Sequence, residues 1–199
     1  MIALIDYKAG NLTSVRKALA ALGAEVIVPG VPGELADAAG VIVPGVGHFG
    51  ATRALDTPWI DGILARVGEG RPLLGICLGM QWLFEGSEEA PTLPGLGLLA
   101  GRCYKLQADG VKVPHVGWNS LAIGRADASL LDCVADGSQV YFTHSYVAPV
   151  TGDAAAVTEH GGRFAAVVQR GYVGGVQFHP EKSGDVGLRI LRNFLELAG

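Results

Sequence analysis

The chain has 199 residues, of which 49% are hydrophobic and 17% are charged, and its formal net charge is −4 at pH 7. This balance excludes intrinsic disorder, which requires low hydrophobicity and high net charge. The length predicts a single domain over residues 1–199. The sequence has no basic stripe, so we expect no nucleic-acid partner. Its 30 glycines, about twice the usual frequency, indicate tight turns or a backbone close to a ligand.

Targeting and cysteine patterns narrow the class of protein further. No stretch approaches the roughly 18 apolar residues of a membrane span, and the apolar run 1–5 is too short for a secretory signal. Cys77, Cys103 and Cys133 are widely spaced, which fits neither a disulfide framework nor a zinc site. We therefore expect a cytoplasmic protein with no metal and no membrane contact.

The first half of the chain alternates strand and helix patterns. Apolar runs at 2–5, 26–28, 41–43 and 72–76 predict strands buried on both faces. A first helix is predicted between an Asn11 cap and a Gly23 stop, and further helical segments over 59–67 and 80–84. This order predicts an α/β fold with an open, mostly parallel central sheet and helices on both faces.

The second half has short runs separated by Gly, Asp and Asn, at 99–106, 111–113, 118–123 and 139–142. These runs predict antiparallel hairpins added to the sheet. Residues 164–169 and 172–178 flank an Arg170-Gly171 turn and form the clearest hairpin. Ser183 is placed to cap a final helix that carries Leu188, Leu191 and Leu195 on one face.

The strongest chemical signal is Gly75-Ile-Cys77-Leu-Gly79, which lies between a predicted buried strand and a helical segment. A strand, a sharp turn around a nucleophile and a helix form a nucleophile elbow, in which the glycines relieve crowding. The N-terminus of the following helix would stabilise a thiolate at Cys77. The alternative is that Cys77 is a small buried apolar residue, as most free cysteines are.

A cysteine nucleophile needs a base and a group that orients the base. Phe178-His179-Pro-Glu181 offers both at the end of a predicted strand. In an extended segment the side chains of His179 and Glu181 point to the same side, so the carboxylate can hold the imidazole. The alternative is a surface histidine at a strand end.

Pro44-Gly-Val-Gly47 ends another predicted strand, and its glycines could let a peptide turn an N–H toward an oxyanion. With the N–H of Leu78 this would complete an oxyanion hole; an ordinary strand-to-helix turn is the alternative. Among the other histidines, His48, His115 and His160 show no partner pattern. His144 is interpreted as structural or as a wall of the site.

Residues 75–81 together with 178–181 resemble the class I (triad) glutamine amidotransferases. Further blocks at 5–11, 44–47, 113–119, 141–146 and 177–183 resemble the glutaminase subunits of imidazole glycerol phosphate synthase, so the likeness spans nearly the whole chain. Val46 supports this branch, because anthranilate-type relatives usually carry proline there. Lys8 departs from it: the family commonly has glycine at this position, in a loop near its synthase partner.

The resemblance implies a flavodoxin-like class I amidotransferase domain with a catalytic triad of Cys77, His179 and Glu181. It places the oxyanion at backbone N–H groups of Leu78, Val46 and Gly47. It implies no cofactor. The positions that match glutamine-binding residues of the family are Gly45, Gly47, Gln81, Glu89, Ser145 and Tyr146.

The resemblance also implies a partner, a (β/α)8-barrel cyclase subunit in a heterodimer. The cyclase would use the ammonia to make imidazole glycerol phosphate and an aminoimidazole carboxamide ribotide in histidine biosynthesis. Asn11, Tyr141 and Lys182 are the candidate interface residues.

Two other functions stay open at this point. One is a glutaminase serving anthranilate, pyridoxal phosphate or purine synthesis, against which Val46 and the Gly117-Trp-Asn119 block argue. The other is a non-catalytic regulatory subunit, against which the intact triad argues.

Overall fold

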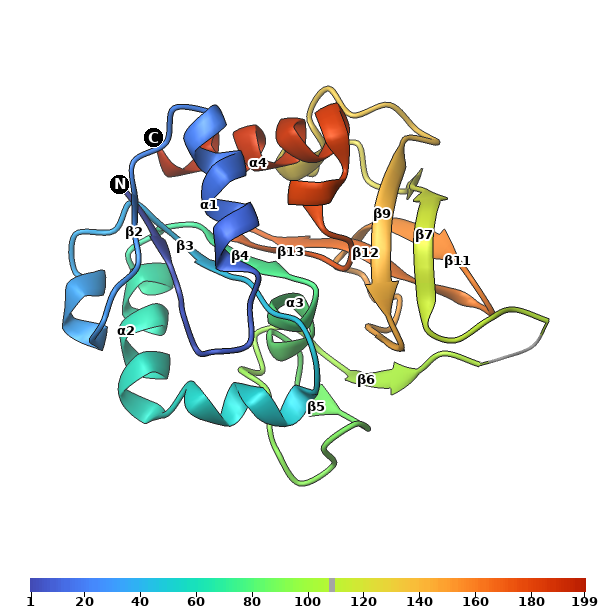
Figure 1. Ribbon diagram of the computed structural model, residues 1–199, viewed down its shortest axis with the longest axis horizontal. Helices are drawn as coiled ribbons and strands as arrows, with labels where there is room; N and C mark the ends of the chain where they lie inside the picture. The colour runs from blue at the N-terminus through green and yellow to red at the C-terminus, as the bar shows by residue number, and fades with distance from the viewer. Residues whose placement is uncertain (108–109) are drawn as a thin grey trace.

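The computed structural model describes residues 1–107 and 110–199, and within them the largest element is an eight-stranded sheet (Figure 1). Its spatial order is β2-β1-β3-β4-β13-β12-β11-β8. The strands from β2 to β13 pair in parallel, and those from β13 to β8 pair antiparallel. The strands are β1 (Ile2–Leu4), β2 (Val26–Ile27), β3 (Gly40–Val43), β4 (Leu73–Ile76), β8 (Ala122–Ile123), β11 (Ala154–Glu159), β12 (Arg163–Arg170) and β13 (Val173–Val176).

Helices cover both faces of this sheet because both faces are apolar. Successive side chains of a strand point to opposite sides, so in β3 Ile42 packs into one buried cluster and Val41 into the other. Helices α1 (Leu12–Ala21) and α4 (Gly184–Ala198) cover the first face, and α2 (Thr57–Gly68) and α3 (Leu78–Trp82) cover the second (Figure 1). The predicted α/β architecture is confirmed. Short 3-10 segments connect the layers: η1 (Pro32–Leu35), η2 (Phe49–Ala54), η3 (Ser129–Leu131) and η4 (Pro180–Lys182).

Most of the predicted hairpins in the second half do not extend the central sheet. Strands β7 (His115–Ser120) and β9 (Gln139–His144) pair with each other beside it, and only β8 of this region joins it (Figure 1). Strand β6 (Arg102–Lys105) lies between β5 (Gly86–Ser87) and β10 (Tyr146–Val147) in a separate small sheet. The prediction of hairpins added to one sheet is therefore wrong here, because a run of apolar residues does not identify the strand with which it pairs.

Two further differences from the sequence analysis have local causes. The predicted strand at 111–113 is irregular, and its residues are exposed or half-buried before β7 begins at His115. Strand β11 was not predicted, because its sequence Ala-Ala-Ala-Val-Thr-Glu is poor in the β-branched and aromatic residues that favour strands.

Both predicted boundaries of the first helix are confirmed. The Asn11 side chain accepts a hydrogen bond from the Ser14 N–H (3.4 Å), and the chain leaves the helix through Gly23, whose φ is 79°. The β12–β13 hairpin is also confirmed, with Gly171 at φ 56° in the turn. No helix within the described residues is long and apolar enough to cross a membrane.

Ser183 precedes α4 as predicted, but its side chain does not cap the helix. The hydroxyl donates to the His179 carbonyl (2.7 Å) and accepts from the Tyr141 N–H (2.9 Å). Gly187 allows α4 to approach the same turn, since a Cβ there would lie 1.9 Å from the Pro180 carbonyl oxygen. Strand β9, the turn after β13 and α4 are thereby fixed to one another around His179.

Candidate active site

Cys77 occupies a strained turn between β4 and α3. Its φ of 52° and ψ of −106° lie outside the regions that L-residues ordinarily adopt. The flanking glycines are required by space: a Cβ on Gly79 would lie 1.8 Å from the Val43 carbonyl oxygen, and one on Gly75 would lie 2.6 Å from the Gly79 backbone. The Cys77 N–H donates to the Val176 carbonyl (2.8 Å), which attaches the elbow to β13.

His179 and Glu181 reach the elbow because β13 lies next to β4, parallel to it. Nδ1 of His179 is 2.9 Å from Oε1 of Glu181, and both side chains are almost fully buried. The segment is not extended as predicted, since residues Pro180–Lys182 form the η4 turn. The carboxylate therefore meets the imidazole because the chain turns back, and not because side chains alternate along a strand.

The surroundings of His179 favour its charged form. Burial lowers the pKa of this imidazole, but its interactions with the nearby Cys77 and Glu181 side chains raise it more, to about 9. Its Nε2 is buried and forms no hydrogen bond within residues 1–107 and 110–199. The nitrogen not held by Glu181 is therefore available to exchange a proton.

This raised pKa predicts that the free energy of unfolding falls at alkaline pH. The pKa of His179 is about 9 in the folded state against an ordinary 6.5, so its stabilising contribution is complete below pH 6.5 and is lost as the pH rises through 9. Urea unfolding between pH 6 and 10 should record this decline. In Glu181→Gln the decline should be smaller, because the imidazolium loses one partner; equal declines in both proteins would contradict the assignment.

Two of the three predicted oxyanion donors, Leu78 and Val46, are already engaged with other carbonyls. The Leu78 N–H donates to the Gly45 carbonyl (3.3 Å), and the Val46 N–H donates to the Ala9 carbonyl (2.5 Å). Gly47 has a φ of 92°, which favours glycine. In this conformation the expected oxyanion hole of Leu78 and Val46 is therefore not formed, because sequence does not fix which carbonyl accepts from a loop N–H.

Gly45 lies too close to its neighbours for any side chain. A Cβ there would lie 2.0 Å from the Tyr7 hydroxyl and 2.8 Å from the Leu78 Cβ. The Tyr7 hydroxyl is itself buried, and it has no hydrogen-bond partner in the part of the chain that the structure describes. The segment that carries Val46 thus packs directly against the elbow.

A cavity of about 310 Å³ opens beside Cys77. Of the predicted glutamine contacts, Gly45 does not line it, because Gly45 packs beneath the elbow. Glu89 does line it and accepts a hydrogen bond from the Phe49 N–H (2.6 Å). The residues around the cavity are Gly47, Cys77, Leu78, Gln81, Glu89, Pro114, Thr143, His144, Ser145 and Tyr146.

Pro114, Thr143 and Gln177 were missed by the sequence analysis. The first two line the cavity, and the Gln177 amide donates to Cys77 Sγ (3.6 Å). Only Gln177 could have been found from the sequence, because it is a polar residue at the end of a predicted buried strand, directly before Phe178.

Three of the other histidines form a cluster that no sequence pattern indicated, and His144 also lines the cavity, as interpreted. His115 Nδ1 lies 3.2 Å from His144 Nε2, and its ring stacks on His160 at 4.0 Å between centroids. Burial and His160 lower the pKa of His115 to about 4, and burial and His115 lower that of His144 to about 3. His48 caps η2 by accepting from the Gly50 N–H (2.9 Å). His115 and His144 come together through the β7–β9 pairing, and His160 joins them from the turn after β11; the sequence revealed neither contact.

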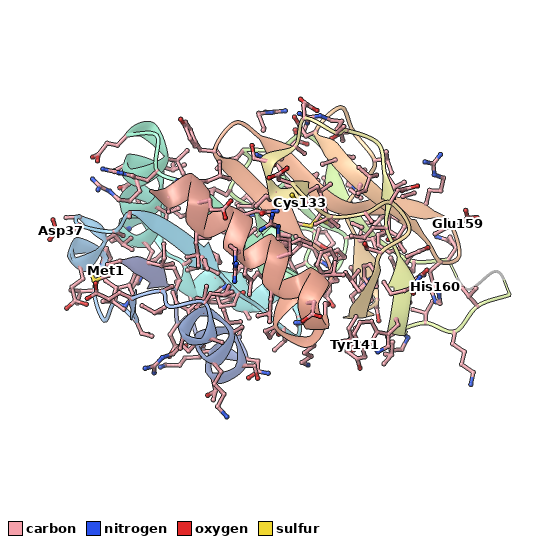
Figure 2. All side chains as sticks on the ribbon, turned by 90° about the horizontal axis from the view of Figure 1, so that it is seen from above. Met1, Asp37, Cys133, Tyr141, Glu159 and His160 are labelled. Atoms are coloured by element: carbon pink, nitrogen blue, oxygen red, sulfur yellow. The ribbon has the colours of Figure 1, made fainter. Side chains whose placement is uncertain are left out.

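The three candidate interface residues lie around the η4 turn. Lys182 Nζ is 5.8 Å from the centre of the Tyr141 ring, and α1, which begins after Asn11, packs against η4. Trp118 on β7 lies opposite Tyr141 on β9, and its side chain is 57% exposed. In Figure 2, Tyr141 lies at the surface beside the start of α4, while Met1 and Asp37 mark the far end of the molecule.

No group of three or more His, Cys, Asp or Glu side chains is arranged to hold a metal ion in residues 1–107 and 110–199. The candidate reactive groups are the buried side chains of Cys77, His179 and Glu181, of which Cys77 lines the cavity.

Comparison with known proteins gives one consistent result. The sequence matches the family Glutamine amidotransferase class-I over residues 3–198. It is 51% identical to imidazole glycerol phosphate synthase subunit HisH of Gloeobacter violaceus, covering 99% of this chain and 89% of that protein. It is 48% identical to the subunit of the same name from Halobacterium salinarum, covering 98% and 92%. A crystal structure of a glutamine amidotransferase shares the fold, with a TM-score of 0.78, 24% identity and full coverage of both chains.

Proposed function

The chain belongs to the glutamine amidotransferase class-I family, and from this premise we infer that it is the glutaminase subunit of an imidazole glycerol phosphate synthase in histidine biosynthesis. The observation that carries its chemistry is the buried pair of His179 and Glu181 beside Cys77 at the elbow. The family match over residues 3–198 supports the proposal of one amidotransferase domain.

The first half of the reaction forms a thioester. The Cys77 thiolate attacks the side-chain carbonyl carbon of glutamine, and a tetrahedral oxyanion forms. The imidazolium of His179 donates its Nε2 proton to the amide nitrogen, the C–N bond breaks, and ammonia leaves. Since the pKa of His179 is about 9, the imidazole carries that proton at neutral pH.

The second half hydrolyses the thioester. Neutral His179 now takes a proton from water, and the oxygen of that water attacks the thioester carbon. The C–S bond breaks, and glutamate and the Cys77 thiolate are released, so the site returns to its starting charge. Glu181 holds Nδ1–H throughout and keeps Nε2 directed toward the reaction.

The cavity offers complementary groups for glutamine. The Glu89 carboxylate can pair with the α-ammonium group, while Gln81, Ser145 and Tyr146 line the same space. The oxyanion requires N–H donors, and those of Leu78 and Val46 must first leave the Gly45 and Ala9 carbonyls. We therefore propose a backbone rearrangement at residues 45–47, for which the two glycines give freedom.

The proposed partner is a (β/α)8-barrel cyclase subunit in a heterodimer, which receives the ammonia. The exposed Trp118 beside Tyr141 and Lys182, together with Asn11, offers an aromatic and cationic contact surface for it. We also propose a cytoplasmic location, because Cys77, Cys103 and Cys133 are all free thiols.

Isotope transfer tests this function directly. With glutamine labelled by ¹⁵N at the amide, the cyclase subunit and its ribotide substrate, we expect the label in imidazole glycerol phosphate. Unlabelled ammonium in the buffer should dilute the label little if ammonia passes directly between the subunits. Label appearing only as free ammonium would favour the alternative, a glutaminase serving another pathway.

A further inference from the structure

Gln177 is the first residue after β13, two residues before His179, and its side chain is fully buried. Its Nε2 donates to Cys77 Sγ at 3.6 Å, and its Oε1 accepts from Gln81 Nε2 at 3.1 Å. The reaction described above gives this amide no role. A buried amide whose donor end contacts the nucleophile nevertheless affects the charge on that nucleophile.

The direction of the Gln177 amide is fixed by its neighbours. The Tyr146 carbonyl can only accept, and it takes a hydrogen bond from Gln81 Nε2 (2.8 Å). The same Gln81 nitrogen donates to Gln177 Oε1, so that oxygen must face Gln81. The NH₂ group of Gln177 is then left to face the sulfur.

We propose that Gln177 is a positioning residue for the nucleophile: its amide N–H holds Cys77 Sγ in place and stabilises the thiolate over the thiol. A group that can only donate favours the negatively charged acceptor. Because Gln81 lines the cavity, the same chain of hydrogen bonds links the glutamine-binding surface to the sulfur. This inference deepens the proposed function and rests on it only for the role of Cys77.

The other titratable groups around the sulfur stay constant in the test. Tyr7 approaches Cys77 from the loop after β1, His179 approaches it from the turn after β13, and Glu89 lies across the cavity. None of these is altered when Gln177 is replaced, so a changed response of the thiol to pH reports on the amide.

The experiment measures alkylation of Cys77 by iodoacetamide against pH in the full chain, read by mass spectrometry. Cys133 is replaced by serine in every protein, because it is exposed, whereas Cys103 is buried. In Gln177→Met, which keeps the length of the side chain, we expect the midpoint of the profile to rise by about one pH unit. The alkylation rate at neutral pH should then fall about tenfold, since the thiolate is the reactive form.

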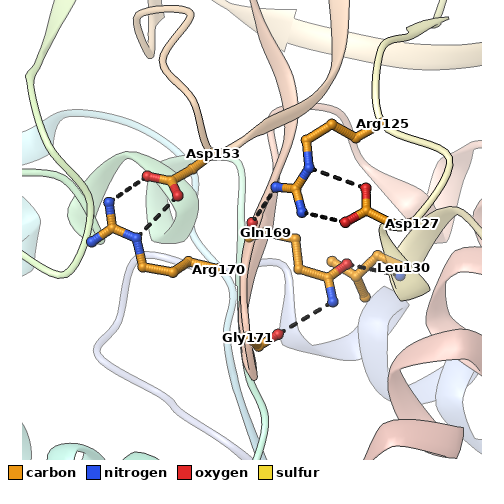
Figure 3. Close-up of polar contacts among 7 residues, drawn as sticks. All are labelled: Arg125, Asp127, Leu130, Asp153, Gln169, Arg170 and Gly171. Carbon is orange, nitrogen blue, oxygen red and sulfur yellow. Dashed lines mark hydrogen bonds and ion pairs between the residues drawn. The ribbon is translucent and has the colours of Figure 1, made fainter.

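Gln169→Met is the matched control. Gln169 on β12 is also buried, and its side-chain amide accepts from the Leu130 N–H (3.0 Å) and donates to the Gly171 carbonyl in the following turn (3.3 Å; Figure 3). Its hydrogen bonds do not involve Cys77, so this variant loses a buried amide without touching the sulfur. Its alkylation profile should match that of the parent.

A Gln177→Met profile that superimposes on the parent profile would overturn the proposal. Gln177→Leu gives a second reading, because its side chain also lacks a donor and should displace the profile in the same direction; a Leu variant as reactive as the parent would overturn the proposal too. If the parent fails the ¹⁵N transfer test, the proposed function fails, yet the alkylation profiles still decide the contact between Gln177 and Cys77.

Discussion

Replacing Cys77 with alanine is expected to lower the rate of glutamine-dependent synthesis by about 10⁴-fold or more, because no other group can form the thioester. Synthesis from added ammonium should persist in the complex with the cyclase, since that reaction bypasses the cavity. Both rates are measured as formation of imidazole glycerol phosphate, with glutamine or with ammonium salt as the nitrogen donor.

The other cysteines provide the controls for this experiment. Cys103 is fully buried, and burial raises the pKa of its thiol far above the ordinary value, so it cannot supply a thiolate. Cys133 is exposed, and Figure 2 places it beside α4. Cys103→Ala and Cys133→Ala should retain glutamine-dependent synthesis. If Cys77→Ala retained it as well, the nucleophile would be assigned wrongly.

The elbow could be predicted because its cause is local. Gly75 and Gly79 flank Cys77 within five residues, and the close approach of Gly75 to the Gly79 backbone follows from that short turn, whereas Gly79 is crowded by Val43 of β3. His179 and Glu181 were paired correctly for a reason that was partly wrong, since a 3-10 turn and not an extended strand brings them together.

What could not be predicted depends on contacts between distant segments. The β12–β13 hairpin joins neighbouring runs through Gly171 and was predicted, but β7 and β9 meet across an intervening segment. That pairing brings His115 to His144, and His160 reaches His115 from the turn after β11, so each histidine looked isolated in the sequence. Strand pairing over long separations is set by the whole fold and not by the pattern within one run.

The state of the oxyanion segment is a similar case with a functional consequence. The sequence predicts Val46 and Leu78 as oxyanion donors, yet in the structure their N–H groups donate to the carbonyls of Ala9 and Gly45. The two bonds stabilise a conformation in which Glu181 holds His179 but the expected oxyanion hole is not formed. The nucleophile and the base can thus be in place without the N–H donors that would stabilise the oxyanion.

We therefore expect the isolated chain to hydrolyse glutamine slowly and the cyclase with bound ribotide to accelerate it by at least about 10²-fold, the effect of gaining one oxyanion donor. The physical reason is that docking beside η4 and the loop before Asn11 can shift the Ala9 carbonyl and release the Val46 N–H. The measurement is the rate of glutamate formation by the chain alone, with the cyclase, and with the cyclase plus ribotide.

Two variants separate this explanation from simple stabilisation by the partner. In Gly47→Ala the new methyl group has open space, but a φ of 92° is strained for any residue other than glycine. We expect this strain to shift the equilibrium between the bonded and released states of the Val46 N–H. The factor by which the partner accelerates glutamate formation should then differ from that of the parent. Gly68→Ala, at the end of α2 and also in open space, has no such strain and should respond to the partner as the parent does. The explanation would be rejected by full glutaminase activity in the isolated parent chain, because oxyanion donors held by Ala9 and Gly45 could not support that rate.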